Sequence, residues 1–270
     1  MPRGAASIPA AMDPTTSSAN FRMDNRVALI TGAGRGIGLA MAQTLAAAGC
    51  AVAIQDIELD VAEAEVAKLT SAGHRAIALG GDVLDLDLPK RAVAEVVARL
   101  GGLHVLINNA AIQQPNYWLD ATPSEMERQL RADLVTPILF CQQAVPIFRR
   151  QQWGRIINLG SIQQKGGNPK MLAYSLSKAG LERMTMALAR DLGAGQITVN
   201  LIAPGWIHTH RTRNDFASAA DKAEKGKNAA PLGRVGEPTD FAGITLLLCS
   251  DAGAYITGQT IYVDGGMSAR

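Results

Sequence analysis

The feature that most constrains this chain is a short apolar run that ends in a glycine-rich turn and leads directly into a helix-forming segment. Val27–Ile30 is the apolar run, Gly32–Gly38 contains four glycines, and Leu39–Ala48 is helical in composition. Such a turn lets backbone amides approach a pyrophosphate closely, because no side chain obstructs the approach. The glycines follow G-x-x-x-G-x-G and not the G-x-G-x-x-G fingerprint, so the turn by itself indicates nucleotide binding only weakly.

A second apolar run, Cys50–Gln55, ends at Asp56, which lies 18 residues after Gly38. This is close to the interval of about 20 residues expected for the acid that binds the adenosine ribose hydroxyls. A carboxylate there would repel a 2′-phosphate, so the sequence favours NAD over NADP. Arg35 instead favours NADP, because a guanidinium can bind that phosphate. Asp56 could instead cap a helix that begins near Ile57.

The rest of the chain continues to alternate between apolar runs and helical patterns. We expect strands at Arg75–Leu79, His104–Ile107, Gly154–Leu159, Gln196–Ala203 and Gln259–Val263, and helices at Asp60–Ser71, Pro89–Leu100, Glu125–Arg150, Leu172–Leu192 and Pro238–Ser250. Alternation of this kind predicts an α/β fold with a parallel, doubly wound sheet flanked by helices. We assign 23–270 to one Rossmann-like catalytic domain, in which the irregular, charged stretch 206–230 is expected to form a substrate lid.

Composition excludes several classes of protein. The chain has 270 residues, a net charge of +2 and only 4% aromatic residues, which gives no basis for a nucleic-acid surface. No apolar run reaches the roughly 20 residues that span a bilayer. Residues 1–22 are rich in Ala, Ser, Thr and Pro and lack the apolar block of a signal peptide, so we expect a flexible N-terminal extension.

The three cysteines and four histidines do not suggest a metal site or a disulfide. Cys50, Cys141 and Cys249 are widely separated in apolar or helical sequence, which indicates buried thiols in a reducing compartment and favours a cytoplasmic protein. His208 and His210 form a close pair, but the sequence points to no third ligand. We therefore expect no metal.

The clearest catalytic signal is a tyrosine and a lysine four residues apart. In a helix over Leu172–Leu192, Tyr174 and Lys178 lie on one face. An ammonium about 4 Å from a tyrosinate stabilises it by about 4 kcal/mol at an effective dielectric constant near 20. Tyr174 is therefore a candidate general base, although a surface-exposed polar pair would have the same spacing.

Three further loops at strand ends carry candidate ligand-binding groups. Gly81–Val83 could present Asp82 to an adenine amino group, and Asn108–Ala111 combines amides with small residues beside which a ligand can lie flat. Either loop could instead be an ordinary turn. Ser161 follows the strand Gly154–Leu159, but its neighbours do not form the Gly-x-Ser-x-Gly motif of an esterase. We therefore interpret Ser161 as a hydrogen-bond donor to a substrate oxygen.

Taken together in this order, these motifs make the chain resemble the short-chain dehydrogenase/reductase family over Asn25–Met267. The matching motifs are Thr31–Gly38, Asp82, Asn108–Ala110, Ser161, Tyr174-x-x-x-Lys178, Pro204–Gly205, Tyr255–Gly258 and Val263–Gly266. The resemblance implies a seven-stranded Rossmann-like sheet, a nicotinamide cofactor, and a homotetramer assembled through the helices Glu125–Arg150 and Leu172–Leu192.

The resemblance also implies roles for particular residues. Tyr174 would be the general acid/base, Lys178 would bind the nicotinamide ribose and favour the deprotonated tyrosine, and Ser161 would orient the substrate oxygen. The cofactor would contact residues of the glycine turn and of the strand ends, namely Gly32, Arg35, Gly36, Ile37, Gly38, Asp56, Asp82, Val83, Asn109, Ala110, Tyr174, Lys178, Pro204, Gly205 and Ile207.

Asp133 is a departure from the family pattern. The family commonly has an asparagine in a Val-Asn-Leu setting that helps to hold a water beside the lysine, whereas this chain has Arg131-Ala132-Asp133-Leu134. Aspartate has nearly the same shape, but its charge would compete with Tyr174 for Lys178. We include Asp133 among the catalytic residues and expect an alkaline optimum for oxidation.

The residues expected to face the reacting carbon are mostly polar. They are Gln113, Ser161, Gln163, Tyr174, Trp206 and the stretch His208–Arg213. Such groups suit a small polar alcohol or ketone, and we expect a sugar, a polyol or a sugar acid. The leading function is an NAD-dependent dehydrogenase. The alternatives are an NADP-dependent 3-oxoacyl or other ketone reductase, and a dinucleotide-binding protein without catalysis.

Overall fold

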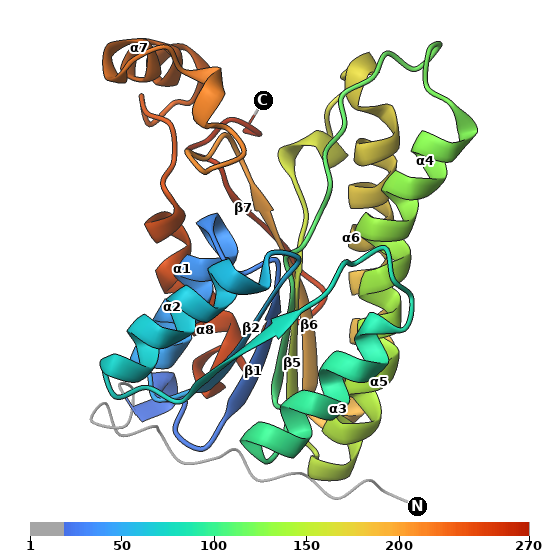
Figure 1. Ribbon diagram of the computed structural model, residues 1–270. Helices are drawn as coiled ribbons and strands as arrows, with labels where there is room; N and C mark the ends of the chain where they lie inside the picture. The colour runs from blue at the N-terminus through green and yellow to red at the C-terminus, as the bar shows by residue number, and fades with distance from the viewer. Residues whose placement is uncertain (1–18, 270) are drawn as a thin grey trace, which may run out of the picture.

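The computed structural model describes residues 19–269 and shows a seven-stranded parallel sheet with helices on both faces (Figure 1). The strand order is β3-β2-β1-β4-β5-β6-β7, and every neighbouring pair is parallel. The strands are β1 (Val27–Thr31), β2 (Ala51–Asp56), β3 (Ala76–Gly80), β4 (Val105–Asn108), β5 (Gly154–Leu159), β6 (Ile197–Pro204) and β7 (Thr260–Val263). The predicted α/β fold class with a doubly wound sheet is confirmed.

The central strands are buried on both faces, which is why they lack the regular polar alternation of a strand with one solvated face. All five residues of β1 and all six of β5 are buried. In β1, Leu29 pairs with Ala53 of β2 on one side and Leu106 of β4 on the other.

Two sets of helices complete the layers. Helices α1 (Gly36–Ala47), α2 (Leu59–Ser71) and α8 (Ala242–Cys249) cover one face, and α3 (Leu88–Leu100), α5 (Thr136–Gln151) and α6 (Leu172–Leu192) cover the other (Figure 1). The first set contributes Met41, Leu45 and Leu248 to one core cluster, and the second contributes Phe140 and Phe148 to another. The sheet thus separates two apolar cores.

The chain reverses its direction of winding at β1, which lies between β2 and β4. In open parallel sheets, ligands bind in the crevice outside the carboxyl ends of the strands at this switch point. The glycine turn follows β1 at that position. The topology therefore places the turn, the end of β4 and the end of β5 around one opening.

The predicted single helix Glu125–Arg150 is interrupted in the structure. Helix α4 (Pro123–Leu130) runs into a π-helical turn, η3 (Arg131–Val135), before α5 begins. Pro137 directly follows this π turn and has no N–H to donate to the preceding helical turn. Single π turns inside helices often mark functional sites, and this one contains Asp133.

The stretch 206–230 is also more regular than the sequence suggested. It contains helix α7 (Ala219–Ala229), which is mostly exposed and has alanines as its only apolar side chains. Its N-terminus is capped by Ser218, whose Oγ accepts from the N–H of Asp221 at 3.1 Å. Lys225 pairs with Asp221 one turn away at 2.8 Å. These local signals could have predicted the helix.

Most of the predicted extension, residues 1–18, lies outside the described residues. Within the described part, Ala19–Phe21 forms a short 3₁₀ turn and Met23 is buried in the first core cluster. None of the helices in residues 19–269 has both the length and the apolar character needed to cross a bilayer.

Candidate active site

A cavity of about 660 Å³ lies at the carboxyl ends of the strands. The ends of β1, β2 and β3 contribute one half of its lining, and the ends of β4, β5 and β6 contribute the other half together with α6 and the stretch 206–230. This volume is in the ordinary range of about 300–1,000 Å³ for cofactor and ligand pockets.

The glycine turn is held against the end of β4 by Asn109. The Nδ2 of Asn109 donates to the carbonyl oxygens of Thr31 and Gly32, both at 2.8 Å. Gly32 has a φ of +59°, and a Cβ there would lie 2.8 Å from the Cα of Ala110. A Cβ on Gly38 would lie 2.5 Å from the Asn109 amide. The motif residues thus fix the turn and keep its surface open.

Asp56 lines the half of the cavity formed by β1, β2 and β3, and it also holds the glycine turn. Its Oδ2 accepts from the N–H of Gly34 at 2.9 Å, and its Oδ1 accepts from the N–H of Glu58 at 3.2 Å. Arg35 lines the same half and forms an ion pair with Glu58. A guanidinium neutralised in this way is less available to a second anion.

Ser161, Tyr174 and Lys178 line the other half of the cavity. Tyr174 and Lys178 project from α6, and the Lys178 Nζ lies 5.4 Å from the centre of the Tyr174 ring. Lys178 is 3% exposed and donates to the carbonyl oxygen of Leu159 at 2.9 Å. Ser161 begins a short 3₁₀ turn after β5, and its Oγ accepts from the N–H of Gln163 at 3.2 Å. Helix α6 and strand β5 therefore bring the three groups to one opening.

Asp133 lies behind this group and not on the cavity surface. Its side chain is fully buried, its Oδ1 accepts from the N–H of Ile112 at 2.8 Å, and its Oδ2 lies 3.7 Å from the Lys178 Nζ. Within residues 19–269 that Oδ2 has no hydrogen-bond partner. Burial raises the pKa of Asp133, and the nearby positive charge of Lys178 opposes this rise.

Nearly all the residues predicted to contact the cofactor line the cavity. They are Gly32, Arg35, Gly36, Ile37, Asp56, Asp82, Val83, Asn109, Ala110, Tyr174, Lys178, Pro204, Gly205 and Ile207. Gly38 does not line it and instead provides close packing between the turn and Asn109. Asp82 is partly engaged as a turn residue, because its Oδ1 accepts from the N–H of Leu84 at 2.9 Å.

The predicted substrate residues Gln113, Gln163 and Trp206 also line the cavity. Of the stretch His208–Arg213, the cavity-lining members are Thr209, His210, Arg211 and Thr212. Met267 and Asp215 line it as well, although no motif pointed to them. Met267 reaches the cavity because the chain after β7 packs against Gly205, where a Cβ would lie 2.7 Å from the Cα of Asp264.

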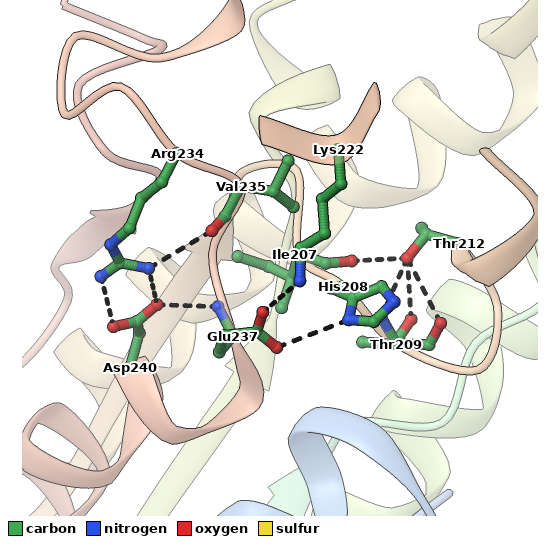
Figure 2. Close-up of polar contacts among 9 residues, drawn as sticks. All are labelled: Ile207, His208, Thr209, Thr212, Lys222, Arg234, Val235, Glu237 and Asp240. Carbon is green, nitrogen blue, oxygen red and sulfur yellow. Dashed lines mark hydrogen bonds and ion pairs between the residues drawn. The ribbon is translucent and has the colours of Figure 1, made fainter. Parts of the chain in front are cut away.

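The stretch 206–230, which we call the lid, is anchored at its base (Figure 2). Glu237 forms an ion pair with Lys222 of the lid and lies 3.6 Å from the Nδ1 of His208. The backbone reinforces this anchor, because the N–H of His208 donates to the carbonyl oxygen of Gly236 at 2.8 Å. The first residues of the lid are thus tied to the segment that follows it.

The three cysteines are buried and free, as expected. Burial raises the pKa of both Cys50 and Cys141 to about 12, so neither is a thiolate near neutral pH. No group of three or more His, Cys, Asp and Glu side chains in residues 19–269 is arranged to hold a metal ion.

Comparisons with known proteins agree with this geometry. A family model described as enoyl-(acyl carrier protein) reductase matches residues 32–268. The 3-oxoacyl-[acyl-carrier-protein] reductase of Aquifex aeolicus is 34% identical, over 92% of this chain and 99% of its own length.

Solved structures also match over nearly the whole chain. A gluconate 5-dehydrogenase from Burkholderia cenocepacia, in complex with NADP and tartrate, has a TM-score of 0.86 and 31% identity, and the match covers 93% of this chain and 98% of that one. A 7α-hydroxysteroid dehydrogenase complexed with NADH and a 7-oxo bile acid has a TM-score of 0.87 and 31% identity, with 92% and 96% covered. The chain belongs to the short-chain dehydrogenase/reductase family and is an oxidoreductase with a nicotinamide cofactor.

Proposed function

We propose that this protein is an NAD-dependent dehydrogenase that interconverts a secondary alcohol and a ketone in a small polar molecule. The observation that carries the proposal is that Ser161, Tyr174 and Lys178 line one cavity together with the glycine turn. A sugar, a polyol or a sugar acid fits the polar groups Gln113 and Gln163 on the substrate side.

The cavity fits a dinucleotide. The glycine turn leaves its backbone open to a ligand, because Gly32 and Gly36 line the cavity and carry no side chain. Asp56 would bind the adenosine ribose and Lys178 the nicotinamide ribose, and both residues line the cavity. When bound, the nicotinamide supplies the hydride acceptor for oxidation and the hydride donor for reduction.

In the direction of oxidation, the side chains handle the proton of the substrate hydroxyl. The Tyr174 phenolate would accept that proton as the hydride leaves the carbon that bears the hydroxyl, and the alcohol would become a ketone. The ammonium of Lys178 stabilises the phenolate before the transfer. The Ser161 hydroxyl donates a hydrogen bond to the substrate oxygen. Reduction uses the same groups, with Tyr174 as the acid.

The preference for NAD rests on the charges at the ribose end of the cavity. The Asp56 carboxylate would repel a 2′-phosphate, and Arg35 is paired with Glu58. We expect the kcat/KM for NAD to exceed that for NADP by at least tenfold, which corresponds to about 1.4 kcal/mol. Glu58→Gln should release Arg35 and narrow the ratio by improving the use of NADP.

Steady-state assays with both cofactors at fixed ionic strength test this preference. Glu63→Gln is the matched control, because it removes the same charge from an exposed position on α2. A wild-type preference for NADP would overturn the assignment of NAD.

A second candidate is an NADP-dependent 3-oxoacyl reductase. It is favoured by the similarity to the Aquifex aeolicus reductase over nearly the full length of both chains. The two functions are separated by comparing reduction of acetoacetyl-coenzyme A with oxidation of a panel of polyols and sugar acids, followed through the absorbance of the reduced nicotinamide. The thioester is the better substrate only for the second candidate.

We also propose that the protein is a cytoplasmic homotetramer. Leu172, Leu176 and Met186 on α6 and Val135 beside α5 are exposed apolar side chains, as expected for helices that pack against another subunit. Light scattering coupled to size-exclusion chromatography measures the subunit number directly, and a monomeric mass would contradict this assembly.

A further inference from the structure

The lid carries a positive charge that reaches across the substrate half of the cavity. The Arg211 guanidinium donates to the carbonyl oxygen of Ala111 at 2.7 Å, although the two residues are 100 positions apart. Ala111 follows β4 and also lines the cavity, so the contact joins the lid to the segment after β4. Arg211 also influences the catalytic centre, because its charge lowers the pKa of Asp133 against the larger effect of burial.

A turn that is closed by the hydroxyl group of Thr212 holds Arg211 in this position. The Oγ1 of Thr212 donates to the carbonyl oxygen of Ile207 at 2.6 Å and accepts from the N–H of Thr209 at 2.9 Å (Figure 2). The turn lies close to the glycine turn, since a Cβ on Gly36 would be 3.4 Å from the Cγ2 of Thr209. The base of the lid is tied down by Glu237 and by backbone hydrogen bonds. Arg211 is therefore presented by a structured segment.

The partner of Arg211 is a neutral carbonyl oxygen, which is a weaker acceptor than a carboxylate. Hydrogen bonds between a guanidinium and a carboxylate are roughly twice as strong as neutral ones and can be bidentate. The Asp215 carboxylate, which also lines the cavity, already accepts from the Nε1 of Trp206 at 3.1 Å. A substrate that carries its own carboxylate could replace the carbonyl of Ala111 as the partner of Arg211.

We propose that Arg211 is a specificity-determining residue that binds the carboxylate of a hydroxy-acid substrate. This inference rests on the proposed function and narrows its substrate class from polar alcohols in general to acids. His210, which lines the cavity next to Arg211, adds a second donor on the same wall.

Binding to the complex of the full-length protein with NADH tests the proposal without any need for turnover. The acidic probes are tartrate and gluconate, and the neutral probe is glucitol, which has the carbon chain of gluconate without its carboxylate. Isothermal titration at constant ionic strength gives the dissociation constants. The wild-type complex should bind the acids more tightly than glucitol.

Arg211→Gln should weaken the binding of the acids roughly 10- to 100-fold, as expected for the loss of a hydrogen bond between charged groups, and should leave glucitol unchanged. Arg211→Lys should retain part of the affinity, because it keeps the charge without the planar fork. Lys227→Gln is the control, because it removes a positive charge from an exposed position on α7 of the same lid. The control should bind the acids as the wild type does.

The proposal is overturned if the wild-type complex shows no preference for the acids. It is overturned equally if Lys227→Gln weakens acid binding as much as Arg211→Gln, or if Arg211→Gln weakens all three probes alike. Failure of the proposed function has a different signature: no alcohol or ketone in the panel would change the absorbance of the nicotinamide, whatever the binding constants are.

Discussion

The side chains that we propose to be catalytic and those of the stretch 206–230 face the same cavity from very different surroundings. Tyr174 and Lys178 are 8% and 3% exposed and stand on a 21-residue helix that packs against the sheet. His210 and Arg211 are exposed and stand on a short turn between β6 and α7. Proton transfer requires fixed groups shielded from water, whereas substrate recognition needs only a stable turn.

This difference predicts that substitution of the buried side chains of α6 causes the largest loss of activity. Tyr174→Phe removes the phenolic oxygen and leaves the ring in place, so the group that takes the proton is lost while the packing is kept. We expect kcat to fall roughly 100- to 10,000-fold, as is usual when a positioned acid/base is removed. Single-turnover measurements of nicotinamide reduction test this expectation.

The affinity of Tyr174→Phe for NADH, measured by fluorescence, should stay within a few-fold of the wild type. Turnover at the parental rate would show that Tyr174 is not the acid/base. The buried side chains of α6 would then have no role in proton transfer.

The next largest effect is expected at the glycine turn. In Gly38→Ala the new methyl group would lie 2.5 Å from the Asn109 Nδ2 and 2.8 Å from the carbonyl oxygen of Gly32. Asn109 would have to give up its hydrogen bonds to Thr31 and Gly32. We expect a loss of roughly 1–3 kcal/mol in the free energy of unfolding and at least tenfold weaker cofactor binding.

Thermal unfolding with and without NADH measures both consequences of Gly38→Ala. Gly167→Ala is the control, because a Cβ at that position meets no atom within 4 Å. Equal behaviour of the two variants would show that the close packing between the turn and Asn109 is unimportant.

The motifs that line the cavity and the position of the lid beside it could be predicted from the sequence, and the contacts that hold the lid could not. The glycine turn, Asp56 and the Tyr174–Lys178 pair depend on local spacing, because consecutive strand ends converge at the switch point and residues four apart share a helical face. The contact between Arg211 and Ala111 joins positions that have no local relationship. The π turn at Asp133 was missed for a related reason: i→i+5 hydrogen bonding leaves no periodicity in so short a segment.

Asp133→Asn has an intermediate expected effect, which is a change in pH dependence. The native pKa of Asp133 is raised by burial, so the folded protein holds this proton to a higher pH than the unfolded chain does. Its contribution to stability is therefore complete below the ordinary value of 3.8 and is lost as the pH rises through the folded value. The melting temperature of Asp133→Asn relative to the wild type should increase with pH.

The pH profile of the oxidation rate should also change in Asp133→Asn. An amide at position 133 carries no charge to compete for Lys178, so the limb of the wild-type profile that rises with pH should shift to lower pH in the variant. Asp120→Asn, at an exposed position before α4, is the control. Superimposable pH profiles for wild type and Asp133→Asn would refute a role for the Asp133 charge.

The smallest effect is expected at the base of the lid, in Glu237→Gln. The variant loses the ion pair with Lys222 and the contact with His208, but the backbone hydrogen bonds between Gly236 and both Trp206 and His208 remain. Partly exposed ion pairs contribute at most about 1 kcal/mol, so the melting temperature should change by less than about 4 °C. We expect the KM of the best acidic substrate to rise about two- to threefold, or ~0.5 kcal/mol, with kcat unchanged. A tenfold rise in KM would mean that ion pairs, and not the backbone, hold the lid in place. The KM would then increase with salt concentration, because salt screens exposed ion pairs, whereas the buried groups of α6 would be insensitive to it.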